Sequence, residues 1–141
     1  SYFTKACFDK KLQLNLESSG DHVTFLDFDI KQIERTVDVK LFDKRNDFPF
    51  SIVRLPFSSS NIPSNMFYAS FGAELLRIGR VCSCLKNFKE SSKALIDRMI
   101  KQGARLDRLH KTIRNSYGRH EVLKVYADNA KQFLNALISD G

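Results

Sequence analysis

LFDKRNDFPFSIVRLPFSSSNIPS, residues 41–64, is the stretch of sequence that decides the fold. It holds all three prolines of the chain, and because proline lacks an N–H and has a fixed φ, the stretch is a poor candidate for a central strand or a helix interior. It also carries four phenylalanines, which an exposed linker would not carry: Phe42, Phe48, Phe50 and Phe57. We therefore expect a junction at residues 49–63 that packs between two differently built parts.

The spacing of apolar residues changes across this junction. Before it, Leu26, Phe28 and Ile30 alternate with charged residues, which predicts an antiparallel β-hairpin over residues 22–43 with one face toward a core. After it, apolar residues recur every three or four positions, which predicts helices at about 64–83, 86–102, 104–117 and 121–139. The expected fold class is α+β. A β-hairpin or small antiparallel sheet in residues 1–48 precedes a bundle of about four helices in residues 64–141.

Length and composition limit the class of protein. A chain of 141 residues with 43% apolar residues can bury a core, and no apolar run is long enough to predict a membrane span or a membrane partner. Three cysteines without zinc-ligand spacing predict reduced thiols in an intracellular protein, and the alternative is a redox role for the Cys82-x-Cys84 pair. The chain begins at Ser1 rather than Met, which leads us to expect a fragment or a processed chain.

The net charge of +7 is concentrated in one stretch. Residues 77–120 hold twelve Lys/Arg against three Asp/Glu, whereas the segments before and after each have a balance of −1. A positive excess confined to predicted helices is typical of a protein that binds nucleic acid, and the alternative is a solvated basic face without a partner. The candidate phosphate-binding residues are Arg77, Arg80, Lys86, Lys89, Arg105, Arg108, Lys111, Arg114 and Arg119.

The same helices allow an alternative interpretation. The helix at 86–102, the tight turn at Gln102–Gly103 and the helix that follows have the outline of a free-standing helix-turn-helix module. In that arrangement Arg105 and Arg108, near the start of the second helix, could reach base edges in duplex DNA.

The hairpin offers an enzyme hypothesis. Asp29, with Asp38 and Lys40, has the carboxylate, carboxylate and lysine arrangement that metal-dependent nucleases place on a hairpin. A cross-strand charge pair on a solvated face explains the same residues. His110 and His120 have no carboxylate or cysteine at ligand spacing, so no metal site is predicted there.

Several short sequence segments, taken together, resemble the C-terminal region of a reverse transcriptase. They are FLDFDI at 25–30, KLFDKRNDF at 40–48, SSNIPS at 59–64, RIGRVCS at 77–83, IKQGARL at 100–106 and YGRH at 117–120. The likeness is to retroelement polymerases of animal genomes, of the Penelope-like and related kinds, and covers roughly residues 12 to 135. It implies that the hairpin closes the palm. The helices would then form a thumb, or a helix-turn-helix-like module, that grips an RNA–DNA hybrid or a DNA duplex.

The resemblance also implies that the catalytic residues lie elsewhere. Such polymerases use a Tyr-x-Asp-Asp motif and Mg²⁺, and in the family this motif lies upstream of FLDFDI. We therefore expect this chain to lack catalytic aspartates and a cofactor of its own, and to work with the remainder of the polymerase. The best partial match to this motif is Tyr126-Ala127-Asp128-Asn129, which falls in the expected last helix and has Asn in place of the second Asp. We interpret it as a coincidence.

Overall fold

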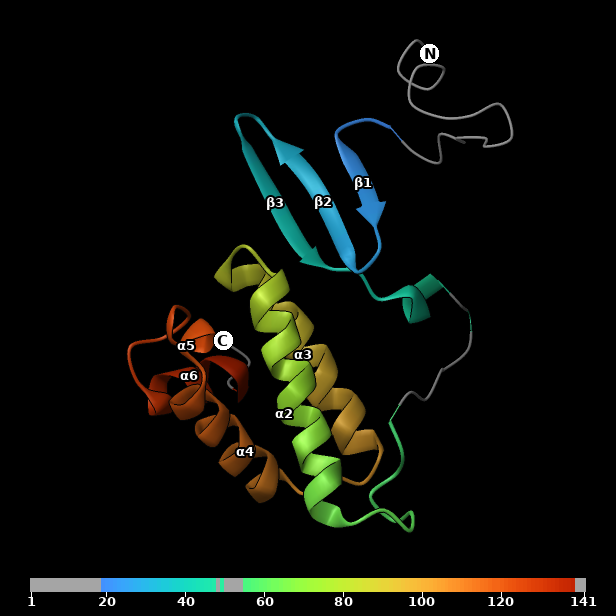
Figure 1. The fold of residues 1–141 in the computed structure, drawn as a ribbon, viewed down its shortest axis with the longest axis vertical. Coiled ribbons are helices and arrows are strands. Elements are labelled where there is room, and N and C mark those ends of the chain that lie inside the picture. The colour runs from blue at the N-terminus through green and yellow to red at the C-terminus, as the bar shows by residue number, and fades with distance from the viewer. Residues whose placement is uncertain (1–18, 48, 50–54, 139–141) are drawn as a thin grey trace, which may run out of the picture.

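The computed structural model describes residues 19–47, 49 and 55–138. These residues form a three-stranded sheet, one 3₁₀ turn and five α-helices (Figure 1). The elements are β1 His22–Phe25, β2 Phe28–Ile33, β3 Thr36–Leu41, the 3₁₀ turn Lys44–Asp47, α2 Ser64–Val81, α3 Leu85–Lys101, α4 Leu106–Arg119, α5 Glu121–Lys124 and α6 Ala130–Ile138. The predicted α+β class, a small antiparallel sheet followed by helices, is confirmed.

The sheet has one strand more than the predicted hairpin. Its spatial order is β1-β2-β3, and each neighbouring pair is antiparallel. The segment expected to be one strand is divided by a two-residue turn between Phe25 and Phe28, in which Leu26 has a φ of +53°. Glu34, in the second turn, also has a φ of +53°. Glycine is the usual residue at such a φ, and the turn at Leu26 lacked it, so this turn was not predicted. The second turn is the one that the predicted hairpin required.

The pairing register separates the side chains of the sheet into an apolar face and a polar face. Phe25, Phe28 and Leu41 are cross-strand neighbours on the apolar face, whereas Asp29 lies opposite Lys40 on the polar face. Leu41 packs against the helical core, but Phe25 is 62% exposed and no residue of the three strands is buried. The face that was predicted to form a core is therefore largely open to solvent.

The hydrophobic core lies within the helices. Each of the five contributes side chains that are almost completely buried, including Phe71 and Leu75 from α2, Phe88 and Met99 from α3, Leu109 and Ile113 from α4, Leu123 from α5 and Phe133 from α6. The spacing of three or four residues that predicted the helices places these side chains on one stripe of each helix. Most of the buried apolar surface of the described residues therefore lies between the helices.

The expected last helix is two helices, α5 and α6. Between them, Asn129 Oδ1 accepts the N–H of Gln132 at 2.8 Å, and Gln132 Oε1 accepts the N–H of Asp128 at 3.1 Å. These bonds satisfy backbone donors at the start of α6, as in a capping box, and so begin a new helix. The end of α3 was predicted correctly, because Gly103 follows it with a φ of +91°.

Residues 55–63 of the junction lie along the α3–α4 turn. The N–H of Ser58 donates to Gln102 O and its hydroxyl donates to Gly103 O, both at 2.9 Å. Leu55 packs against the core, whereas Phe57 is 49% exposed. This position differs from the predicted packing between the sheet and the helices, while Phe48 and Phe50 lie outside the described residues.

Candidate nucleic-acid interface

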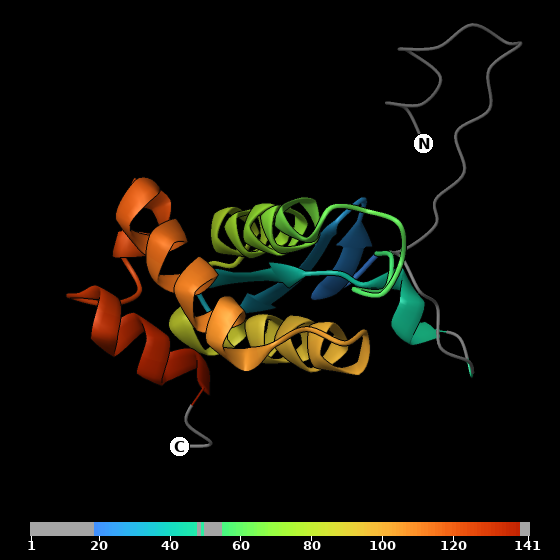
Figure 2. The ribbon, with the colours of Figure 1, turned by 90° about the horizontal axis from the view of Figure 1, so that it is seen from below.

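Polar contacts attach the edge strand β3 to the connection between α2 and α3. Val39 O accepts the N–H of Ser83, and the N–H of Val39 donates to Ser83 Oγ, both at 2.9 Å. Asp38 accepts hydrogen bonds from Asn87 Nδ2 and Ser83 Oγ, also at 2.9 Å, and these bonds lower the pKa of Asp38. Strand β3 contacts both α2 and α3, and in the view of Figure 2 it is seen between these two helices.

Two of the nine predicted phosphate ligands are already paired with carboxylates. Arg77 Nη2 lies 2.7 Å from Asp27 Oδ2, and Arg77 Nη1 lies 3.4 Å from Glu74 Oε2. The hydrogen bond with Asp27 is the main cause that raises the pKa of Arg77. Arg105 Nη2 lies 3.1 Å from Asp107 Oδ2. Arg77 therefore belongs to the attachment of the sheet, and Arg105 has its charge partly neutralised.

Arg108 is positioned by an aromatic ring. Its guanidinium carbon lies 4.2 Å from the centre of the Tyr68 ring, which is the geometry of a cation–π contact. Tyr68 is buried, and its hydroxyl accepts the N–H of Arg105 at 3.0 Å. Because stacking uses the face of the guanidinium and not its N–H donors, the contact fixes the position of Arg108 and leaves these donors unused. Sequence reasoning missed Tyr68, since it precedes Arg108 by forty positions and only the fold brings the two together.

The other six predicted ligands have no hydrogen bond or ion pair with any residue that the structure describes. They are Arg80, Lys86, Lys89, Lys111, Arg114 and Arg119. All are exposed except Lys89, which is half-buried. Among the residues that the structure describes, no carboxylate neutralises the charges of these six side chains. The six cations are distributed over three helices: Arg80 lies on α2, Lys86 and Lys89 lie on α3, and Lys111, Arg114 and Arg119 lie on α4.

The carboxylates of the sheet are engaged with neighbouring residues. Lys40 Nζ lies 3.7 Å from Asp29 Oδ2, and His22 Nε2 contacts Asp29 Oδ1. Asp38 lies opposite Lys31 and is held by α3. Within residues 19–47, 49 and 55–138, no group of three His, Cys, Asp or Glu side chains is arranged to hold a metal ion. The cross-strand charge pair that the sequence suggested accounts for Asp29 and Lys40.

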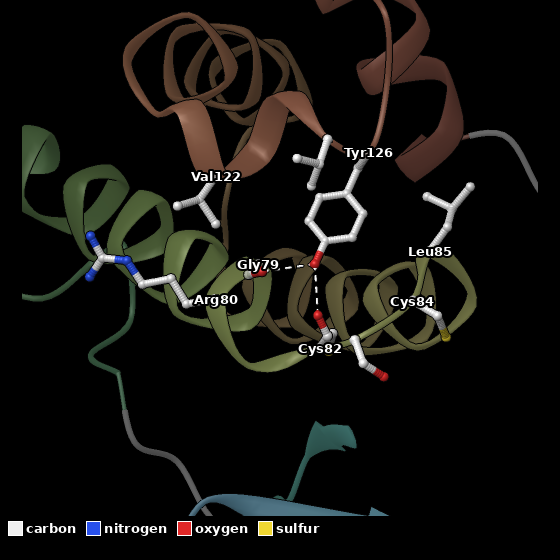
Figure 3. A pocket seen from close by; sticks show the side chains of 9 residues that line it. Gly79, Arg80, Cys82, Cys84, Leu85, Val122 and Tyr126 are labelled. Atoms are coloured by element: carbon white, nitrogen blue, oxygen red, sulfur yellow. Dashed lines mark hydrogen bonds between the residues drawn. The ribbon is translucent and has the colours of Figure 1, made fainter. Parts of the chain in front are cut away.

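Tyr126 lines an open pocket of about 580 Å³ at the end of α2 (Figure 3). Its hydroxyl lies 2.8 Å from Gly79 O and 2.9 Å from Cys82 O, and its ring stacks on Phe88 with 4.1 Å between the ring centres. Burial raises the pKa of Tyr126 to about 12, so the hydroxyl stays protonated and donates. Figure 3 also shows Arg80 extending away from the Tyr126 ring. Tyr126 of the Tyr-x-Asp-Asn sequence therefore holds the loop before α6 against α2.

Comparison with protein-family models, with curated proteins and with solved structures found no match to this chain. Among the described helices, none combines the length and apolar character needed to cross a membrane. A functional assignment therefore has to rest on the geometry of the basic helices and on the sequence phrases quoted above.

Proposed function

We propose that this chain binds the sugar–phosphate backbone of a nucleic-acid duplex through its basic helices. The observation that carries the proposal is the set of six cations on α2, α3 and α4 that no described carboxylate neutralises. Few acidic residues in the same stretch oppose them, and one of these, Asp107, is paired with Arg105. Phosphates would replace water and counterions around these side chains, and the release of counterions would drive binding.

The sequence resemblance supports a more specific role within this proposal. The helices act as the thumb of a reverse transcriptase and hold an RNA–DNA hybrid or a DNA duplex. The catalytic aspartates and their Mg²⁺ belong to the remainder of the polymerase. Because a thumb contacts phosphates and not base edges, binding is expected to be independent of the nucleotide sequence.

A second candidate is a free-standing helix-turn-helix module. It is favoured by the glycine turn at Gly103 and by Arg105 at the start of α4, whose side chain is 73% exposed. A recognition helix reads base edges, so this candidate predicts strong preference for one duplex sequence over a scrambled duplex.

The test is fluorescence-anisotropy binding of the purified chain to an RNA–DNA hybrid, a DNA duplex and the single strands over a salt series. Four or five phosphate contacts give a slope of log affinity against log salt of about −4. The double variant Arg108→Ala/Lys111→Ala should bind at least about tenfold more weakly and reduce the slope by about 2. The matched control, Lys31→Ala/Arg35→Ala, removes two exposed charges from the sheet and should change little.

Each outcome has a defined meaning. Salt-steep binding to duplexes of any sequence supports the thumb proposal, whereas preference for one sequence supports the helix-turn-helix candidate. A slope near zero, or no binding to any probe at low salt, overturns nucleic-acid binding by this chain.

A further inference from the structure

Helices α2 and α4 run in the same direction and touch along one line. Tyr68 of α2 contacts Arg108 of α4. Further along, Gly72 lies against Ser116 and Thr112. The buried residues of α2 and α4 lie on one side of this line of contact, and the other side of the line is open to solvent. The pair therefore presents one outer face to solvent.

Helical geometry identifies the residues of this outer face. Each successive residue of a helix is rotated by about 100°, so Ala69 and Ala73, one position after Tyr68 and Gly72, turn away from the core. On α4, Lys111 and Asn115 stand one position before Thr112 and Ser116 and turn away in the same manner. Leu76 lies on the same side of α2 but also packs against the core. The face, called here the α2–α4 face, consists of Ala69, Ala73, Leu76 and Arg80 from α2 and Arg108, Lys111, Asn115 and Arg119 from α4. All of these residues are exposed except Leu76 and Arg108, which are half-exposed.

The α2–α4 face has four cations and no carboxylate. The acidic residues of the two helices are directed elsewhere, because Glu74 contacts Arg77 on the side of the sheet and Asp107 contacts Arg105. Arg80, Lys111 and Arg119 have no partner among the described residues, and Arg108 is held by Tyr68 with its donors free. The charge of this face is therefore positive and uncompensated.

The cations follow one another along the face. At about 1.5 Å per residue, the fourteen residues of α4 span about 21 Å. Arg108 and Lys111 lie near the start of α4, and Arg119 is its last residue. Arg80 continues the series, because its neighbour Gly79 lies against Leu123 of α5, beyond the end of α4. The four cations therefore extend along the length of α4, and a duplex strand that runs along the face could contact them in turn.

We propose that the α2–α4 face receives the backbone of one strand of the duplex. This inference rests on the proposed function and specifies where binding occurs. Arg108, Lys111, Arg119 and Arg80 bind phosphates along the strand. Ala69 and Ala73 have short side chains, so the sugar–phosphate backbone of the strand can approach α2 closely at these positions. The lysines of α3 lie outside the face and contribute little.

The test introduces one negative charge at two different places. Ala73→Glu puts a carboxylate in the middle of the α2–α4 face, and Ala94→Glu puts one on α3. Both alanines are exposed in helices and glutamate is a good helix former, so both variants should fold, which circular dichroism and thermal unfolding confirm. With a DNA duplex probe, Ala73→Glu should weaken binding at least about tenfold, and Ala94→Glu by less than about twofold. The two variants have the same net charge, so a difference between their affinities for the duplex shows on which surface the duplex binds.

A third variant separates this inference from the proposed function. Lys86→Ala/Lys89→Ala removes two cations of α3 and should reduce affinity by less than about threefold. If this variant binds much more weakly while Ala73→Glu binds normally, the strand lies on α3 and the inference is overturned, although nucleic-acid binding stands. Equal weakening by Ala73→Glu and Ala94→Glu also overturns it. If the unmodified chain binds no duplex, the proposed function itself falls.

Discussion

Two glycines in helices have opposite surroundings. An ideal Cβ at Gly79 in α2 would lie 2.5 Å from Leu123 Cδ2, and Leu123 is completely buried. At Gly118 in α4, no atom of the described residues lies within 4 Å of such a Cβ, apart from its chain neighbours and the nearby backbone of its own helix, and the residue is exposed. Gly79 is therefore needed for α5 to pack on α2. Gly118 serves no packing contact with any described residue, and α4 continues past it to Arg119.

We expect alanine to have opposite effects at these two glycines. Gly79→Ala should lower the free energy of unfolding by about 1–3 kcal/mol, because the added methyl group overpacks the core. Gly118→Ala should raise it by about 0.5–1 kcal/mol, because alanine loses less backbone entropy in a helix. Urea denaturation of the two variants measures both changes. Wild-type stability of Gly79→Ala would contradict the packing of α5 on α2.

Asp43 is held by two arginines. It accepts hydrogen bonds from Arg45 Nε and Nη2 at 2.8 Å and from Arg98 Nη1 at 2.7 Å. Burial alone would raise the pKa of Asp43, but the bonds from Arg45 and the charges of both arginines outweigh burial and lower the pKa to about 2. The carboxylate therefore stays ionised in the folded chain at a pH where an unfolded chain would protonate it.

Asp43 should stabilise the fold at neutral pH and lose this effect in acid. Its folded pKa is below the usual value of 3.8, so the contribution is complete above about pH 5 and disappears as the pH falls through 4 toward 2. Asp43→Asn should cost about 1–2 kcal/mol at pH 7, less than the full pKa shift implies because solvent screens a partly exposed pair. The difference from wild type should vanish near pH 2. Urea denaturation at both pH values checks this, and a difference that is independent of pH would refute it.

At the level of elements, Ser83 links the sheet to the helices. It exchanges hydrogen bonds with Val39, and its hydroxyl also reaches Asp38. Ser83→Ala removes the hydroxyl, so the amide of Val39 should exchange with deuterium about tenfold faster, which corresponds to about 1.4 kcal/mol. The amide of Ile113 in α4 should be unaffected. Hydrogen exchange measures both, with Ser70→Ala as the control because Ser70 Oγ bonds only within its own helix, to Met66 O. Unchanged exchange at Val39 would mean that the hydroxyl does not hold the sheet.

The elements that the sequence predicted well are those with local signals. Apolar spacing is local, so α2, α3 and α4 were expected close to their observed positions, and the glycine at 103 marked the end of α3. The break at Leu26 lacked the glycine or asparagine that usually marks a tight turn, and the start of α6 depends on the side chains of Asn129 and Gln132. The candidate cations were visible in the sequence. The ion pair of Arg77 with Asp27 was not, because fifty positions separate these residues.

Over the whole molecule, the buried core and the exposed apolar residues lie in different parts. Phe88 and Phe71 are completely buried among the helices, whereas Phe25, Leu26 and Val37 of the sheet are 62%, 75% and 59% exposed. Burial of apolar surface is the main source of stability, so the helices should supply most of the free energy of unfolding. The sheet should contribute through a few polar contacts.

This division predicts very different costs for two substitutions of the same kind. Phe88→Ala should lower the free energy of unfolding by about 3–5 kcal/mol, because it leaves a cavity beneath the stacked ring of Tyr126. Phe25→Ala should change it by less than about 1 kcal/mol, because most of the ring already contacts water. Urea denaturation measures both, and sedimentation at the same concentration shows whether the chain is monomeric. A large loss for Phe25→Ala in a monomer would mean that the sheet belongs to the core after all, since an exposed ring has little burial energy to lose.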